Sequence, residues 1–154
     1  MVFDGLTMGK TQRQKEGEME EGKIVRSAAI IENDPYAKHL GIEFTLIEEG
    51  HAKSRMELKP EHKNFMGMIH GGAIFSLADA TFGAAANSYG KRAMAIHVSI
   101  DYLQAPGDTP YLEADVRETA RAGRVRHYFM EVRNILGEAV AVCHGWAYHT
   151  DRDV

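Results

Sequence analysis

Residues 71–87 read GGAIFSLADATFGAAAN, a stretch of 17 residues with one charged side chain, Asp79. As a helix this stretch is almost five turns, or roughly 25 Å, long. Apolar residues lie on nearly every side of it, and a helix that is apolar all round is normally buried. Gly83 and the three alanines after it keep the helix thin, so we expect sheet backbone to approach closely there. The rest of the chain must supply a cover for this helix.

Segments with a period of two flank the helix on both sides. Before it, Asp34 and Pro35 begin a short helix that ends at Gly41, and residues 42–48 and 52–58 form a hairpin. After it, the same alternation predicts four strands, at residues 94–103, 111–119, 125–135 and 139–149. This order predicts an α+β fold in which one curved antiparallel sheet of about six strands wraps around the long buried helix.

Composition limits the class of protein. The 154 residues predict one domain, and 44% hydrophobic with 26% charged residues is typical of a globular chain. A net charge of −4 disfavours nucleic-acid binding, which needs a basic surface. The longest uncharged run, residues 64–78, is too short for a membrane span, and no apolar signal-peptide core is visible. With a single cysteine, Cys143, we expect a cytoplasmic protein without an internal disulfide that binds neither nucleic acid nor membrane.

The N-terminal segment differs from the rest of the chain. Residues 10–23 carry eight charges and one apolar side chain, Met19, so they cannot bury much surface. We interpret residues 1–25 as a charged tail, or at most an exposed helix, and residues 26–154 as the folded domain.

Residues 62–79 read HKNFMGMIHGGAIFSLAD. This motif resembles the signature H-x-N-x-x-G-x-x-H-G-G-x-x-x-x-L-x-D of hotdog-fold acyl-CoA thioesterases, in particular the phenylacetate-degradation (PaaI-type) subfamily. Asn87-Ser88, residues 99–103 and residues 106–108 add to the resemblance, which spans residues 35–149. It implies a hotdog fold and the hydrolysis of acyl-CoA to free acid and CoA. It implies no metal and no redox cofactor, since CoA is part of the substrate.

Asp79 is the candidate catalytic carboxylate. Its helical neighbours include Phe75 and Phe82, and no Lys or Arg lies between residues 64 and 90. We therefore expect a buried, unpaired carboxylate with a raised pKa, which is costly unless it serves a function. The alternative is an aspartate on an exposed helix face. The resemblance implies that Asp79 attacks the thioester carbonyl as a nucleophile or activates water as a base.

The start of the helix supplies the other catalytic candidates. Gly71 and Gly72 permit the turn into the helix, and the free N–H groups there stabilise an oxyanion. The resemblance assigns the oxyanion N–H to Gly71 and leaves Gly72 as a substrate-binding candidate. His70 either acts as a general acid or fixes the loop, and Asn64 either orients water or the carbonyl or caps the loop.

Substrate-binding candidates lie on both sides of the motif. Arg121 and Arg124, with Arg126, crowd one turn, where they either hold the phosphates of CoA or form an ordinary solvated surface. Arg124 is the stronger candidate, because the resemblance places a basic residue after this glycine turn. Phe75 is a candidate for the acyl pocket. Phe75 and four other apolar side chains either line such a pocket or fill the core; the four are Phe65, Met66, Met68 and Phe82.

Other site types are less well supported. The remaining histidines form no pair at helical spacing, so we predict no metal site. A catalytically idle acyl-CoA-binding protein on the same fold is the main alternative function, although the retention of Asp79 argues against it. A hotdog dehydratase is less favoured, because the sequence shows no hydratase signature.

Helix geometry predicts a shared active site. Gly71 and Asp79 are eight residues apart on one helix, which is roughly 12 Å along its axis. The oxyanion donor and the carboxylate must both lie about 3 Å from one carbonyl. A homodimer with antiparallel helices would bring Gly71 of one chain opposite Asp79 of the other. The resemblance further implies that two dimers pair into a homotetramer.

Overall fold

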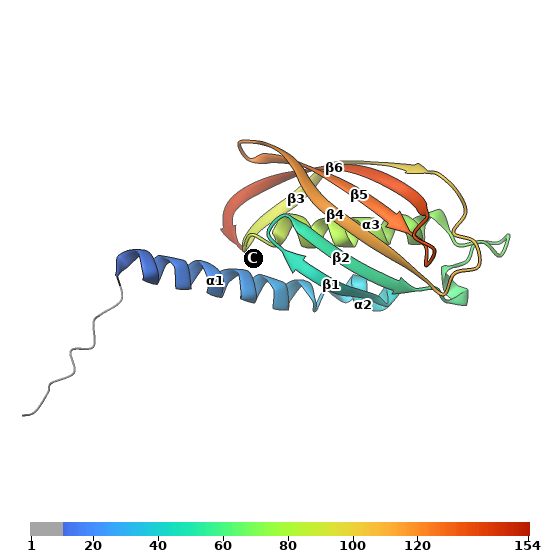
Figure 1. Cartoon of the computed structure of the whole chain (residues 1–154), viewed down its shortest axis with the longest axis horizontal. Helices are drawn as coiled ribbons and strands as arrows, with labels where there is room; N and C mark the ends of the chain where they lie inside the picture. The colour runs from blue at the N-terminus through green and yellow to red at the C-terminus, as the bar shows by residue number, and fades with distance from the viewer. Residues whose placement is uncertain (1–10) are drawn as a thin grey trace, which may run out of the picture.

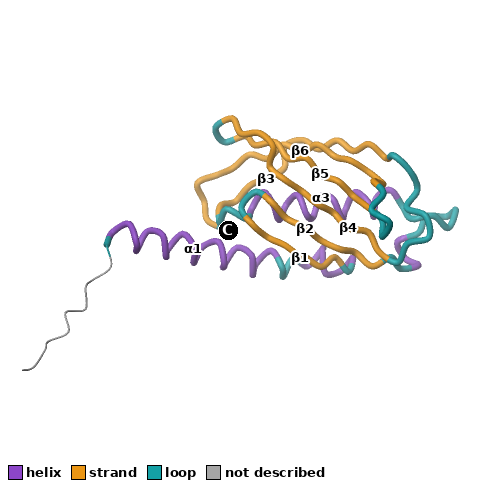
Figure 2. The backbone as a smooth tube through the Cα atoms, viewed as in Figure 1, coloured by secondary structure: helices purple, strands orange, loops and turns teal. Residues whose placement is uncertain are grey.

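Helix α3 spans Gly71–Asn87, the bounds that the sequence predicted. The structure is a computed structural model that describes residues 11–154. A single curved sheet covers α3, as Figures 1 and 2 show. Leu77, Ala78 and Phe82 are at most 1% exposed, because this face of the helix packs against the sheet. The α+β hotdog architecture is confirmed.

The opposite face of α3 is open, which corrects the prediction of a helix buried all round. Gly72 and Asp79 are exposed there, and Ser76, Ala80 and Gly83 are half-buried. One sheet curves over one side of a helix and cannot close around it within this chain length.

The close approach between α3 and the sheet also occurs at a different residue from the one that the sequence predicted. A Cβ at Gly83 would meet no atom within 4 Å, whereas a Cβ at Gly145 on the sheet would lie 2.9 Å from Phe82 Cζ. The prediction for Gly83 was wrong, since this residue lies on the open side of the helix.

The sheet is antiparallel throughout, in the order β1-β2-β4-β5-β6-β3. All six predicted strands are present, with ends that differ by at most four residues. Strand β3 pairs only with β6 and forms one edge, where Met94 and Ile96 are each 58% exposed. The strands are β1 Ile42–Glu48, β2 His51–Glu57, β3 Lys91–Tyr102, β4 Tyr111–Ala122, β5 Val125–Arg133 and β6 Ala139–Asp153.

Two short helices lie outside the sheet: one comes just before β1, and the other comes between β2 and α3. Helix α2, Pro35–Leu40, begins where predicted, with Asp34 accepting the Ala37 N–H at 2.7 Å, and Gly41 ends it at φ 73°. The 3-10 helix η1, Pro60–His62, was not predicted.

Helix α1, Gln12–Ile31, extends six residues beyond the end of the segment that the sequence set apart. Residues 12–22 are exposed along it, and the helix continues without a break past residue 25. Its last turns reach the body of the protein, where Ser27 is buried and Ile31 packs against the core (Figure 1). Residues 1–10 of the predicted tail lie outside the described residues. No helix within residues 11–154 is long and apolar enough to cross a membrane.

Candidate active site

The loop before α3 is held in place by its own backbone. The His70 N–H donates to the His62 carbonyl at 2.8 Å, and Lys63 and Ile69 form an isolated bridge. His62 is 5% exposed and its Nδ1 accepts the Lys59 N–H. The loop therefore delivers residue 70 to the helix start in a fixed position.

His70 caps the helix in an asymmetric way. Its Nδ1 accepts a hydrogen bond from the Gly72 N–H at 2.8 Å. The Gly71 N–H has no acceptor within residues 11–154. A Cβ at Gly72 would lie 2.9 Å from His70 Nδ1, so a larger residue there would displace the capping ring. The first turn thus keeps one free N–H, that of Gly71, at the positive end of the helix dipole.

Asn64 uses half of its amide to shape the loop. Its Oδ1 accepts the N–H groups of Met66 and Met68 at 2.9 and 3.1 Å. Its Nδ2 makes no hydrogen bond to the described residues. The capping role that the sequence allowed is present, and the amide nitrogen is left as a donor.

Asp79 lies two turns along the open face of α3. Its side chain is exposed in the single chain, so the prediction of a buried carboxylate was wrong at this level. Partial desolvation by the surrounding helices still raises the pKa of the Asp79 carboxyl. No donor or cation pairs with Asp79 within the part of the chain that the structure describes. A carboxylate without a partner and with a raised pKa is suited to accept a proton or to attack an electrophile.

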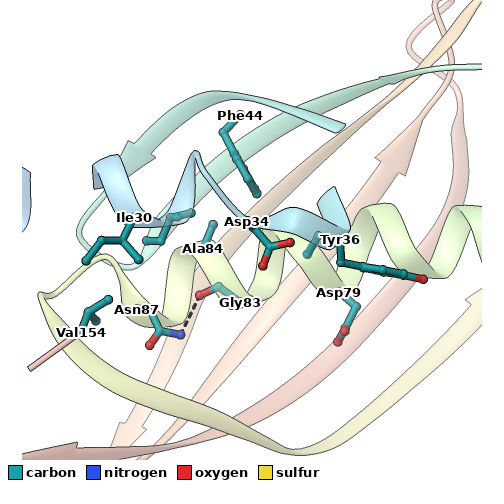
Figure 3. Close-up of a pocket in the computed structure, with 11 residues that line it drawn as sticks. Ile30, Asp34, Tyr36, Phe44, Asp79, Gly83, Ala84, Asn87 and Val154 are labelled. Carbon is teal, nitrogen blue, oxygen red and sulfur yellow. Dashed lines mark hydrogen bonds between the residues drawn. The ribbon is translucent and has the colours of Figure 1, made fainter. Parts of the chain in front are cut away.

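A cleft of about 350 Å³ begins beside Asp79 and runs along α3 (Figure 3). Tyr36 of α2 stands near Asp79 at one end, and its hydroxyl shares a hydrogen bond of 2.9 Å with Ser76 Oγ. The walls come from the last residues of α1, from α2 and from β1. The lining residues are Ile30, Ile31, Asp34, Tyr36, Phe44, Asp79, Ala80, Gly83, Ala84, Asn87 and Val154.

The aromatic residues that the sequence favoured for a pocket lie elsewhere. Phe82 is 1% exposed in the core, where its ring centroid is 5.2 Å from that of Tyr128. Phe65 is 96% exposed on the loop. Phe75 is half-buried on α3, outside the set that lines the cleft.

The structure separates the two candidate arginines. Arg121 is paired with Glu118, with 2.7 Å between Nε and Oε1. Arg124 pairs with the exposed Asp151 and lines a second cleft. That cleft also contains Arg92 and Arg152, and it meets the first cleft at Asn87. Three guanidinium groups therefore gather at the end of α3 far from Gly71.

Metal ligands do not cluster in the described part of the chain. Within residues 11–154, no three His, Cys, Asp or Glu side chains are placed to hold a metal ion.

Comparisons with known proteins agree with this arrangement. Residues 22–142 match the model of the family described as "Domain of unknown function (DUF4442)". A "Putative esterase" of Archaeoglobus fulgidus is 39% identical over 121 residues, or 79% of each chain. The acyl-coenzyme A thioesterase PaaI of Escherichia coli is 38% identical over 119 residues, which are 76% of this chain and 84% of that protein. The chain belongs to the DUF4442 family and to the PaaI-type hotdog thioesterases.

Two solved structures share the fold of this chain. The structure of E. coli PaaI has a TM-score of 0.79 to this chain at 32% identity and covers 87% of it and 98% of that chain. The structure of smu.793 from Streptococcus mutans UA159 bound to acetyl CoA has a TM-score of 0.67 at 27% identity, covering 73% and 91%.

Several residues at the site of this PaaI-type thioesterase lie outside the motif. Tyr36, Phe44, Arg92 and Arg152 come from segments up to about a hundred residues apart, and no local pattern connects them. A signal for Tyr36 exists only in its position just after the predicted helix start at Asp34-Pro35. The fold, not the spacing, brings these side chains to α3.

Proposed function

We propose that this protein hydrolyses acyl-CoA thioesters to a free acid and CoA. The observation that carries the proposal is the first turn of α3, where His70 occupies the Gly72 N–H and leaves the Gly71 N–H free. The same helix carries the unpaired carboxylate of Asp79. The name of the E. coli relative and the acetyl CoA bound to the S. mutans relative support the substrate class.

The Gly71 N–H acts as the oxyanion donor in this proposal. When the thioester carbonyl is attacked, negative charge develops on its oxygen. A backbone N–H at a helix N-terminus stabilises that charge without having to reorganise. The Nδ2 of Asn64 offers a second donor for orienting water or the carbonyl.

Asp79 supplies the attacking oxygen in one of two ways. As a base it takes a proton from water while the water oxygen bonds to the carbonyl carbon. The intermediate then collapses, the C–S bond breaks, and the thiolate of CoA takes the proton. As a nucleophile its carboxylate bonds to the carbonyl carbon and expels the thiolate, and water then hydrolyses the mixed anhydride.

The site is shared between two chains, which explains the exposed Asp79. One helix holds its Gly71 and Asp79 roughly 12 Å apart, too far for one carbonyl. The open face of α3 and the unpaired edge of β3 lie uncovered in one chain, and Met94 and Ile96 add apolar surface at that edge. A two-fold dimer through this side would place Gly71 of each chain opposite Asp79 of the other. Pairing of two dimers into a tetramer is the next step that we expect.

The CoA phosphates bind at arginines in this proposal. Arg124, Arg92 and Arg152 line one cleft, and guanidinium groups form strong bonds to phosphate oxygens. Arg121 is the weaker candidate, because its ion-pair partner Glu118 is 12% exposed and fixed in place, whereas Asp151, the partner of Arg124, is 83% exposed and can give way to a phosphate.

A thiol-release assay over a broad panel of acyl-CoA esters tests the function. We expect free CoA to appear without added metal and with chelator present. Asp79→Asn should lower kcat/KM by about 100-fold or more while the melting temperature stays within a few degrees, since no partner is lost. The raised pKa predicts that kcat/KM falls on acidification at a pH above the usual Asp range. An absence of CoA release over the whole panel would favour the binding-protein alternative.

A further inference from the structure

Gly83 is a costly residue that nothing packed against it within one chain explains. It lies inside α3 and its φ is not positive, so the backbone does not need glycine there. A Cβ at this position would meet no atom within 4 Å. Glycine inside a helix is less favourable than alanine by about 0.5–1 kcal/mol. The helix therefore gives up stability to keep a space open.

The open space belongs to the cleft beside Asp79. Gly83 is one turn beyond Asp79, roughly 6 Å along the axis, and Asn87 is roughly 12 Å beyond it. Figure 3 shows Gly83 and Ala84 between Asp79 and Asn87, with Phe44 and Ile30 facing them across the cleft. A chain that starts at a carbonyl beside Asp79 and runs along α3 must pass over Gly83.

The walls of the cleft suit an apolar chain. Ile30, Ile31 and Phe44 present hydrocarbon, and small residues form the floor. Besides Tyr36 and Asp79 at the reacting end, two polar side chains line the cleft, Asp34 and Asn87, and both are hydrogen-bonded. Asp34 accepts the Ala37 N–H, and the Asn87 amide donates to Gly83 O at 2.9 Å and accepts the Ala93 N–H. An apolar ligand would therefore leave the Asn87 amide hydrogen-bonded, and the exposed Asp34 carboxylate would stay in solvent at the rim.

We propose that this cleft takes the acyl group of the substrate and that Gly83 sets the length it accepts. Because the cleft extends from Asp79 past Gly83 to Asn87, roughly 6–12 Å along the axis, the substrate class is CoA esters of medium-length acyl chains, hexanoyl to decanoyl. The negative charge of Asp34 at the rim disfavours acyl groups that end in a carboxylate. This inference rests on the proposed function, because it needs the reacting carbonyl beside Asp79 and the CoA phosphates at the arginine cleft of the partner chain. In the antiparallel dimer the partner helix runs away from Asn87, so the cleft beside Asp79 is left for the acyl group.

Three glycine variants test the proposal. Gly83→Leu fills the cleft, Gly83→Ala fills it in part, and Gly17→Leu is the matched control. Gly17 is also a helical glycine whose Cβ would meet nothing within 4 Å, but it lies on the exposed part of α1. The readout is kcat/KM for acetyl-, hexanoyl-, octanoyl- and decanoyl-CoA, with succinyl- and glutaryl-CoA as the carboxylate-ended group.

In the wild type we expect octanoyl-CoA to exceed acetyl-CoA and both carboxylate-ended esters in kcat/KM. Gly83→Leu should lower the octanoyl-to-acetyl ratio by about tenfold or more, as expected for one filled apolar pocket. Gly17→Leu should leave the ratio unchanged. Gly83→Ala should lower it less while raising the melting temperature, since alanine favours the helix and meets no neighbour. This second variant keeps the test valid if leucine disturbs folding.

The two proposals fail in different ways. If the wild type hydrolyses no acyl-CoA, the proposed function is wrong. If it hydrolyses acyl-CoA but both Gly83 variants keep the wild-type octanoyl-to-acetyl ratio, the assignment of the cleft is wrong. Sedimentation of both Gly83 variants shows whether the oligomeric state has changed. If the octanoyl-to-acetyl ratio changes only when the oligomeric state does, Gly83 is an interface residue and the assignment is again wrong.

Discussion

His70 illustrates how one side chain decides which backbone groups are available. Its Nδ1 accepts the hydrogen bond of the Gly72 N–H, so that only the Gly71 N–H stays free for the substrate oxygen of the proposed mechanism. The sequence left two roles open for His70, general acid or structural cap. Measurements of stability and activity can distinguish them.

Replacing His70 tests that choice. His70→Ala should lower the free energy of unfolding by about 1 kcal/mol, because a helix cap is lost. His70→Asn restores a good capping residue and should recover most of this stability in urea unfolding. If capping is its role, His70→Asn also recovers most of the activity of the wild type. Equal loss of activity in both variants would identify His70 as a proton donor instead.

Arg124 tests where the CoA phosphates bind. Arg124→Ala should raise KM for an acyl-CoA several-fold and leave kcat nearly unchanged, because a remote phosphate contact is the same in ground and transition states. The matched control is Arg55→Ala, which removes another exposed arginine from an ion pair, with Glu113, on β2 and β4. With an acyl pantetheine that lacks the nucleotide, Arg124→Ala should behave like the wild type. An equal loss on both substrates would assign Arg124 a structural role.

Single residues were predictable from the sequence only where a local motif holds them. Gly71 and Asp79 are named by the spacing of one segment, and the capping geometry of Asp34 follows from its Pro35 neighbour. Phe82 and Gly83 are adjacent, yet one lies in the core and the other faces the cleft. When a helix is apolar on every side, its sequence does not show which face lies in the core and which faces the cleft.

Elements were predictable to the extent that their signals are local. The bounds of α3, α2 and β1 follow from glycines, a proline and the period of the side chains. The order of the strands in the sheet does not follow from such signals. Strand β2 pairs with β4, although α3 and β3 lie between them in the sequence, and β3 lies at the sheet edge next to β6. Pairing of distant strands depends on how the sheet closes over the helix, which no short window of sequence contains.

The contact between β4, β5 and β6 makes the stability of the fold depend on pH, which the sequence did not indicate. Where β4, β5 and β6 meet, Glu118 accepts hydrogen bonds from Tyr89 and Tyr128 and pairs with Arg126. Tyr128 also shares a 3.2 Å hydrogen bond with Nε2 of His149, which is 5% exposed. Burial, and then the charge of Arg126, lowers the pKa of His149 to about 4.

His149 should therefore destabilise the fold in acid. Its pKa is about 4 in the folded chain and about 6.5 in the unfolded chain, so the unfolded state binds the proton first. The stability that the neutral ring contributes is complete above about pH 6.5 and is lost as the pH falls to about 4, by roughly 2–3 kcal/mol. Urea unfolding at several pH values measures this loss.

The variant His149→Phe removes the titrating ring and should flatten the stability profile over that pH range. The control His39→Phe changes an exposed histidine on α2 and should leave the profile as it is in the wild type. A profile of His149→Phe that still follows the wild type would place the acid sensitivity on other groups.

On the scale of the whole molecule, the proposed mechanism requires parts that a single chain holds but does not bring to one place. Gly71 and Asp79 are held apart by the rigid rise of the helix they share, and Asp79 lies on the side that the sheet leaves open. A second copy is the simplest object that supplies the missing half to each site. This arrangement predicts that two inactive variants can repair each other.

Asp79→Ala removes the carboxylate, and Gly71→Pro removes the N–H at a first-turn position where proline is tolerated. A Cβ at residue 71 would lie 3.1 Å from the Tyr102 hydroxyl, but that side chain is 52% exposed and can turn outward. In a mixed dimer one site collects both lesions and the other collects none. Co-refolding should therefore restore up to half of the wild-type activity per heterodimer, measured after separating differently tagged chains. If each site lay within one chain, every site would keep one lesion and verified heterodimers would stay inactive.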